Sequence, residues 1–259
     1  MGSFFNPADL VPREIACAMG LVPGVILDTK FGRNPDVDAA NVDIINMGGT
    51  YAGMPVDANG SMLTVAEELQ IVCANAADTV AGTGLQVLRV TRLDEDARLV
   101  TQDFEMNGGT LNTGVQACRA WRAKGVRYGS SGTNAGDITV RMRTTTANIF
   151  AVVAAGVGQT ELALITIPAL YVGSIYDPTL QIDKGGSAIL KAAFFTRPEG
   201  QNGFDQKALM QAAGGADRDA PRELYTFPGP CDIKMRVTSA STTNIDTIGT
   251  FKFCLVRTG

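Results

Sequence analysis

Residues 85–93, LQVLRVTRL, alternate in a way that decides the fold class. In an extended strand successive side chains point to opposite faces, so every second residue from Gln86 to Arg92 would share one face. β-Branched and long apolar residues occur in both sets, which is typical of a strand within a sheet. The stretch lies between the turn-rich residues 75–84 and the charged residues 94–96. It therefore predicts one complete strand with a turn on each side.

The same period recurs along most of the chain, between turns rich in Gly, Asn and Thr, at a spacing of about 8–14 residues. No stretch of helical period is long enough to supply the crossovers of a parallel sheet. We therefore expect an all-β fold, an antiparallel β-sandwich (jelly-roll-like), with an extended N-terminal arm. Further strands are expected at residues 68–73, 99–106, 115–128 with a bulge at Gly125, 137–143, 148–155, 162–168, 171–177, 180–183, 188–197, 231–239 and 250–256.

The first 60 residues differ from the rest because prolines and glycines punctuate them throughout. We expect residues 1–60 to form the arm, with one short helix near residues 9–19, and residues 61–259 to form the sandwich body. An arm of this kind buries little of itself, so it would be ordered on its own body or on a neighbouring subunit, or else stay mobile. Residues 198–222, rich in Gly, Asp and Gln, are expected to form a long loop, with a short helix compatible with residues 205–213.

The chain of 259 residues contains no histidine, which excludes several kinds of chemistry. Triads that use an imidazole, zinc sites of the HExxH type and a histidine general base near neutral pH are all ruled out. Acidic clusters such as Asp94-Glu95-Asp96 lack the spacing of an EF-hand. The five cysteines are widely spaced and form no CxxC pair. We therefore expect no enzyme activity, no catalytic residue, no metal and no cofactor.

The net charge of −4 conceals an uneven distribution. Residues 1–110 carry 6 Lys and Arg against 15 Asp and Glu, whereas residues 111–259 carry 16 against 11. The two halves would attract each other within one fold, or would steer like subunits together. A pI near 4.9 argues against general nucleic-acid binding. The start of the chain has no signal-peptide pattern and no apolar stretch is long enough to span a bilayer, so we expect reduced thiols in a cytosol and no membrane partner.

One segment combines positive charge with aromatic rings. Three interpretations remain open: contact with a phosphate backbone or a host glycan, a purely structural strand at a sheet edge, and a salt-bridged contact with the acidic N-terminal region of a neighbouring subunit. The residues concerned, which we take as the candidate interface or ligand contact, are Arg119, Trp121, Arg122, Lys124, Arg127 and Tyr128.

Several short motifs, taken in order, resemble a family of structural proteins of tailed bacteriophages. They are residues 30–38 (KFGRNPDVD), 47–55 (MGGTYAGMP), 82–84 (GTG), 132–138 (GTNAGDI), and 158–160 (GQT) followed by 165–169 (ITIPA). The pattern departs from the family at Leu170-Tyr171, where Gly-Lys would follow Pro-Ala. The loop at residues 198–222 has no counterpart in it.

The resemblance implies a virion component with a β-sandwich core, assembled in the bacterial host cytoplasm. Its partners would be further copies of itself and other virion proteins such as the major capsid or tail proteins. We expect a minor capsid, cement or decoration protein; the alternatives are a tail or head-tail attachment protein that anchors fibres, and a glycan-binding module. The residues expected to dock the arm on a neighbour are Lys30, Phe31, Arg33, Asn34 and Pro35.

Overall fold

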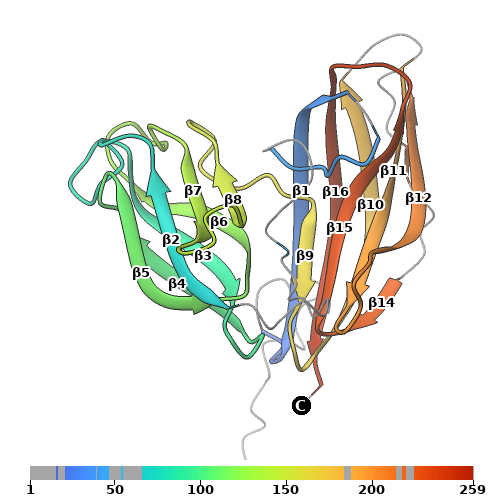
Figure 1. The fold of residues 1–259 in the computed structure, drawn as a ribbon, viewed down its shortest axis with the longest axis horizontal. Helices are drawn as coiled ribbons and strands as arrows, with labels where there is room; N and C mark the ends of the chain where they lie inside the picture. The colour runs from blue at the N-terminus through green and yellow to red at the C-terminus, as the bar shows by residue number, and fades with distance from the viewer. Residues whose placement is uncertain are drawn as a thin grey trace, which may run out of the picture.

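The strands gather in two groups in the computed structural model (Figure 1). It describes residues 16, 21–38, 40–46, 54, 66–183, 188–213, 218–219 and 225–258. Every pairing between named strands in these residues is antiparallel. The predicted all-β, antiparallel β-sandwich class (jelly-roll-like) is therefore confirmed.

The first group, which we call the first sandwich, contains β2 to β8 in two sheets with the orders β5-β2-β7-β8 and β4-β3-β6. Its strands are β2 (Glu67–Cys73), β3 (Leu85–Leu93), β4 (Leu99–Glu105), β5 (Thr110–Ala117), β6 (Arg119–Tyr128), β7 (Ile138–Met142) and β8 (Ile149–Val153). Strand β3 has the predicted bounds, and the predicted bulge at Gly125 is confirmed, since the register of β6 against β3 shifts there. The predicted single strand at 115–128 is wrong, because the chain passes from β5 to β6 at Cys118.

The second group, the second sandwich, also has two sheets. Sheet A has the order β1-β16-β10-β13, with β14 also paired to β10, and sheet B has the order β12-β11-β15-β9. Their strands are β1 (Val25–Val37), β9 (Leu164–Ile167), β10 (Tyr171–Asp183), β11 (Ile189–Pro198), β12 (Asp205–Ala213), β13 (Arg218–Asp219), β14 (Tyr225–Pro228), β15 (Cys231–Ala240) and β16 (Ile245–Arg257). The rings of Phe194 and Phe251 meet edge to face between the two sheets, 5.3 Å apart.

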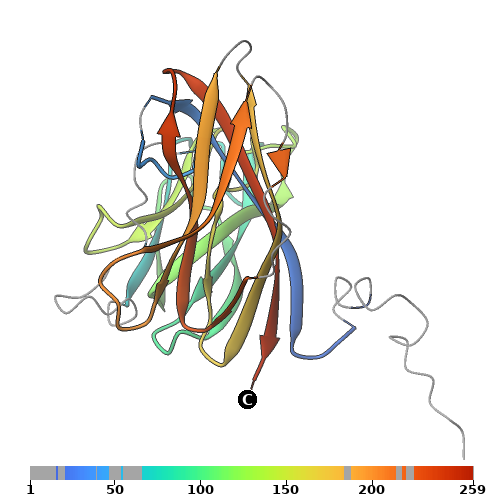
Figure 2. The ribbon, with the colours of Figure 1, turned by 90° about the vertical axis from the view of Figure 1, so that its right-hand side faces the viewer.

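The predicted arm is wrong over residues 25–37, because these residues form β1 and pair along β16 of the same chain (Figure 2). Residues 41–46 also belong to the body, where the amide of Ile44 donates to Met235 and that of Ala163 donates to Ile44. Of the predicted helix at 9–19 only Ala16 is described, and it is helical; the other residues lie outside the described part. The predicted single body is two sandwiches, and the second is built from both ends of the described chain.

The predicted loop at 198–222 and its short helix are wrong over residues 205–213, which form β12. Good helix formers fill this segment, but Ala208, Met210 and Ala212 alternate with exposed residues and turn toward the core. Pairing with β11 overrides the helical propensity, which is only a weak preference. Residues 214–217 and 220–224 lie outside the described part.

Leu170 has a backbone φ of 64°, in the left-handed region that favours glycine. The position is the one at which the phage-family pattern has Gly. We predict that Leu170→Gly raises the free energy of unfolding by up to about 1 kcal/mol, because it removes the clash of Cβ with the backbone. Leu170→Ala keeps Cβ and should give no gain. Equal unfolding midpoints for the two variants in urea would contradict this account.

Candidate functional site

The predicted basic-aromatic segment is β6, and its first residue forms a buried ion pair between the two sandwiches. Arg119 of β6 donates from Nε to Oδ1 of Asp232 on β15 at 3.1 Å and from a terminal nitrogen to Oδ2 at 3.2 Å. Arg119 is 1% exposed and Asp232 is fully buried. A guanidinium that meets a carboxylate with two parallel hydrogen bonds fixes orientation as well as distance. We call the region around this pair the junction.

Two more groups of the second sandwich complete the surroundings of Asp232. Arg197 of β11 donates to Oδ2 at 2.6 Å, and the hydroxyl of Thr166 on β9 donates to Oδ1 at 2.7 Å. Burial by itself raises the pKa of the Asp232 carboxyl, but the two guanidinium groups and the hydroxyl outweigh it and hold the pKa below its usual value. The carboxylate is therefore ionised and fully hydrogen-bonded inside the junction.

Strand β1 also makes polar contacts with β6. The ammonium of Lys30 donates to the carbonyl of Trp121 at 2.5 Å, and Arg122 pairs with Asp28. Burial lowers the pKa of Lys30 well below its ordinary value, and the charge of Arg122 lowers it further, against the opposing effect of Asp28. Contacts at positions 119, 121 and 122 thus tie one strand of the first sandwich to both sheets of the second.

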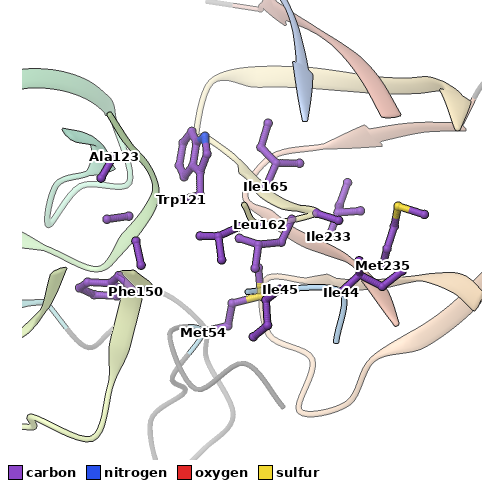
Figure 3. Packing of buried hydrophobic residues seen from close by; sticks show 14 of the residues in the cluster. Ile44, Ile45, Met54, Trp121, Ala123, Phe150, Leu162, Ile165, Ile233 and Met235 are labelled. Atoms are coloured by element: carbon purple, nitrogen blue, oxygen red, sulfur yellow. The ribbon is translucent and has the colours of Figure 1, made fainter. Parts of the chain in front are cut away.

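Apolar side chains fill the space between these polar contacts (Figure 3). Trp121 is 3% exposed and lies in the same buried cluster as Leu162, Ile165 and Phe150. Figure 3 shows the indole beside the segment that carries Leu162 and Ile165. The ring is therefore not available for stacking on a sugar, and the interpretation of Trp121 as a glycan contact is wrong.

The remaining residues of the candidate contact lie along β6 away from the junction. The backbone of Lys124 bridges to Gln159, and the hydroxyl of Tyr128 donates to the carbonyl of Gly158 at 3.2 Å. Arg127 faces Glu105 at 3.6 Å on the surface. Of the six predicted residues, the structure thus brings Arg119, Trp121 and Arg122 together at the junction and spreads the other three along the first sandwich.

The residues predicted to dock the arm on a neighbour contact their own chain instead. The amide of buried Asn34 donates to the carbonyl of Asp43 at 3.1 Å, and Arg33 pairs with Asp246 at 2.5 Å. Phe31 lies opposite Thr250 of β16 and is half-buried, and Pro35 is exposed beside the register shift of β1. With Lys30 in the junction, this set of residues holds β1 in sheet A.

A second buried carboxylate lies next to the junction and was not predicted. Asp43 accepts from Lys234 at 2.9 Å and from Nε of Arg236 at 2.7 Å. The Phe204 ring lies 4.4 Å from the Lys234 nitrogen and 4.5 Å from the guanidinium carbon of Arg197, and so connects this pair to the junction. The charged residues at 232, 234 and 236 alternate with apolar ones, a pattern that is typical of a solvated face. Here the first sandwich and residues 40–46 cover that face.

The glycine motifs of the phage resemblance meet in one loop cluster of the first sandwich. The carboxylate of Asp78, fully buried, accepts the amides of Leu85 at 2.6 Å, Ala135 at 2.8 Å and Gly136 at 2.9 Å. A Cβ on Gly84 would approach Oδ1 of Asp78 to 2.1 Å, so this position requires glycine. The motifs at 82–84 and 132–138 therefore hold loops together around a carboxylate.

Within the described residues no group of three or more Asp, Glu, Cys or His side chains is arranged to hold a metal ion. Cys73, Cys118 and Cys231 are buried and form no disulfide. Burial raises the pKa of the Cys118 thiol to about 11 and that of Cys231 to about 12, so neither is a reactive thiolate at neutral pH. The described part also contains no helix long and apolar enough to cross a membrane.

Comparison of the chain with protein-family models and with curated proteins gives no match. Among solved structures, the chain is similar to that of the infectious bursal disease virus Gx strain with a TM-score of 0.26 and 9% identity, over 91% of this chain and 72% of that one. The infectious bursal disease virus VP2 subviral particle gives a TM-score of 0.24 and 11% identity, over 96% of this chain and 79% of that one. TM-scores this low carry no argument about fold or function.

We predict that Arg119→Met lowers the free energy of unfolding by about 3–5 kcal/mol, because it removes one partner of a buried ion pair and leaves the Asp232 carboxylate under-compensated. Urea unfolding followed by circular dichroism measures the change. Arg89→Met is the matched control, since Arg89 pairs with Asp103 on the surface, and it should change the midpoint little. Equal effects of the two substitutions would contradict a structural role for the junction.

The lowered pKa of Asp232 also predicts a pH dependence of stability. A carboxyl with a lowered folded-state pKa contributes stability in full above its unfolded pKa of about 3.9, and loses it as the pH falls toward the folded value. The stability difference between the wild type and Asp232→Asn should therefore be constant near neutral pH and shrink below about pH 4. A difference that stays the same on acidification would show that Asp232 is not held ionised by its partners.

Proposed function

We propose that the chain is a non-enzymatic structural component of a tailed-bacteriophage virion: a minor capsid, cement or decoration protein that stabilises the particle through subunit contacts. The observation that carries the proposal is the junction. Arg119 and Arg122, which the sequence singled out as candidate contacts, instead pair with Asp232 and Asp28 and lock the two sandwiches into one body. A rigid body is suited to burying area against neighbours, since little order must be gained on binding.

The phage-family motifs support the same proposal through their places in the fold. Residues 82–84 and 132–138 organise the loops around Asp78, and residues 30–38 run along β1 and sheet A. Thr166, within the motif at 165–169, donates to Asp232. Motifs that maintain a scaffold are what a protein that works through its shape requires.

Residues 1–60 were expected to form an arm that docks on a neighbouring protein. Within this proposal, residues 1–20 have that role. They precede β1 and can be removed without cutting into sheet A. We propose that they contact a neighbouring protein of the particle, such as the major capsid protein. Deleting residues 1–40 would remove β1 and is therefore not a clean test.

We predict that the full chain is present in purified phage particles at a copy number in the hundreds, as repeated positions on a symmetric shell require. Quantitative mass spectrometry against the major capsid protein measures this. The chain lacking residues 1–20 should keep the β-sheet circular-dichroism signal of the two sandwiches and be depleted from particles. Normal incorporation of that chain would overturn the role of residues 1–20, and absence of the full chain from particles would overturn the proposed function.

A further inference from the structure

One face of sheet A points away from sheet B and carries an apolar row. The register places Val25 of β1, Val256 of β16, Val172 of β10 and Pro228 of β14 side by side across four strands. The residues between them on these strands, such as Leu255, turn to the buried side. Val256 is 44% exposed. We call this side of β1, β16, β10 and β14 the outer face; Figure 2 shows its strands β1, in blue, and β16, which ends at the C label.

The apolar character continues into the next rows of the outer face. Leu27 and Cys254 form the second row with Ser174, and all three are half-buried. A hollow of about 350 Å³ follows, lined by Leu27, Asp28, Thr29, Tyr176 and Lys252. The face is therefore apolar at the end near the C-terminus and contains a depression that side chains of a partner could fill.

Leu170 lies at the apolar end of the outer face and is an independent sign of a partner. It is 51% exposed, and its carbonyl accepts the amide of Thr258, which follows the end of β16. A leucine with positive φ costs free energy, and one so exposed recovers little of this within its own chain. A contact with another molecule would bury the side chain and offset the cost.

Both basic side chains that the register places on the outer face are paired with carboxylates, which bears on the kind of partner. Lys252 pairs with Asp177 at 2.5 Å, and Arg33 pairs with Asp246 at 2.5 Å. A face whose basic side chains are already paired does not call for a strongly acidic partner. It can also face a copy of itself without a penalty from like charges.

The size of the face matches a protein interface. Strands β1, β16 and β10 have 13 residues each. At about 3.3 Å per residue and about 4.8 Å between strands, they cover roughly 600 Å², before the relief of the side chains is added. Each partner in a standard interface buries about 800 Å².

We infer that the outer face of sheet A packs against the same face of a second copy of this chain. The inference rests on the proposed function, because it names the partner for one of the subunit contacts. Two sheets stack face to face at about 10 Å when their strands are nearly aligned, and identical twisted faces satisfy this in a two-fold arrangement. Val256 and Leu170 are then buried in the contact, and the ion pair of Arg33 on the edge strand β1 lies at its rim.

The test is the self-association of the purified full chain, measured by sedimentation velocity over a range of concentrations. The wild type should form dimers, and Val256→Lys should weaken the dimer by at least about tenfold, because each copy then brings an unpaired charge into the apolar row. Leu209→Lys on β12 is the matched control, since Leu209 is 48% exposed on the other sheet, and it should leave the dimer unchanged. Leu170→Gly should weaken the dimer while it stabilises the protomer.

A second readout needs no substitution. Cys254 lies on the outer face, so its alkylation, followed by peptide mass spectrometry, should slow as the protein concentration rises. A wild type that stays monomeric, equal effects of Val256→Lys and Leu209→Lys, or an unchanged alkylation rate would overturn the inference. Particles that incorporate Val256→Lys normally would overturn it while leaving the proposed function intact. Dimers of a chain that is absent from particles would support the inference and overturn the proposed function.

Discussion

The carboxylate of Asp232 is the constraint on which the rest of the structure depends. It is fully buried and receives Arg119 from one sandwich and Arg197 from the other. Removing three charged side chains from water costs several kcal/mol per ion, so the arrangement is tolerated only because each group has a partner with good geometry. The position of β6, and with it the relative placement of the two sandwiches, follows from satisfying that requirement.

The acidic first half and the basic second half of the chain form ion pairs with each other inside the molecule. Asp28 and Asp43, from the acidic first half, pair with Arg122, Lys234 and Arg236 from the basic second half. These contacts favour attraction between the halves within one fold over steering between subunits.

Much of the fold could be predicted from local pattern, and the junction could not. Strand β3 and the bulge at Gly125 follow from alternation and from a glycine within a strand, both of which are local signals. The alternation of a strand does not reveal which of its faces another element covers. The charged face of β15 therefore has the pattern of a solvated face, although it is buried. Strand β1 was missed because its partner β16 lies more than 200 residues away in the chain, and β12 because edge pairing overrides helix propensity.

The candidate site could also not be predicted from local sequence pattern alone. The basic and aromatic residues of β6 are recognisable in the sequence, but their acidic partners come from three distant segments. Trp121 illustrates the consequence, because an indole among cations resembles a ligand contact until the strands around it are assembled. Burial, which depends on the complete fold, decides between a binding surface and a structural core.

We propose that the junction joins two sandwiches into one body that works through its contacts. Differential scanning calorimetry of the full chain tests it most directly, because two-state unfolding requires equal calorimetric and van't Hoff enthalpies. We predict a single transition with equal enthalpies for the wild type, since one continuous buried cluster extends through both sandwiches. Two separate transitions in the wild type, one for each sandwich, would contradict it.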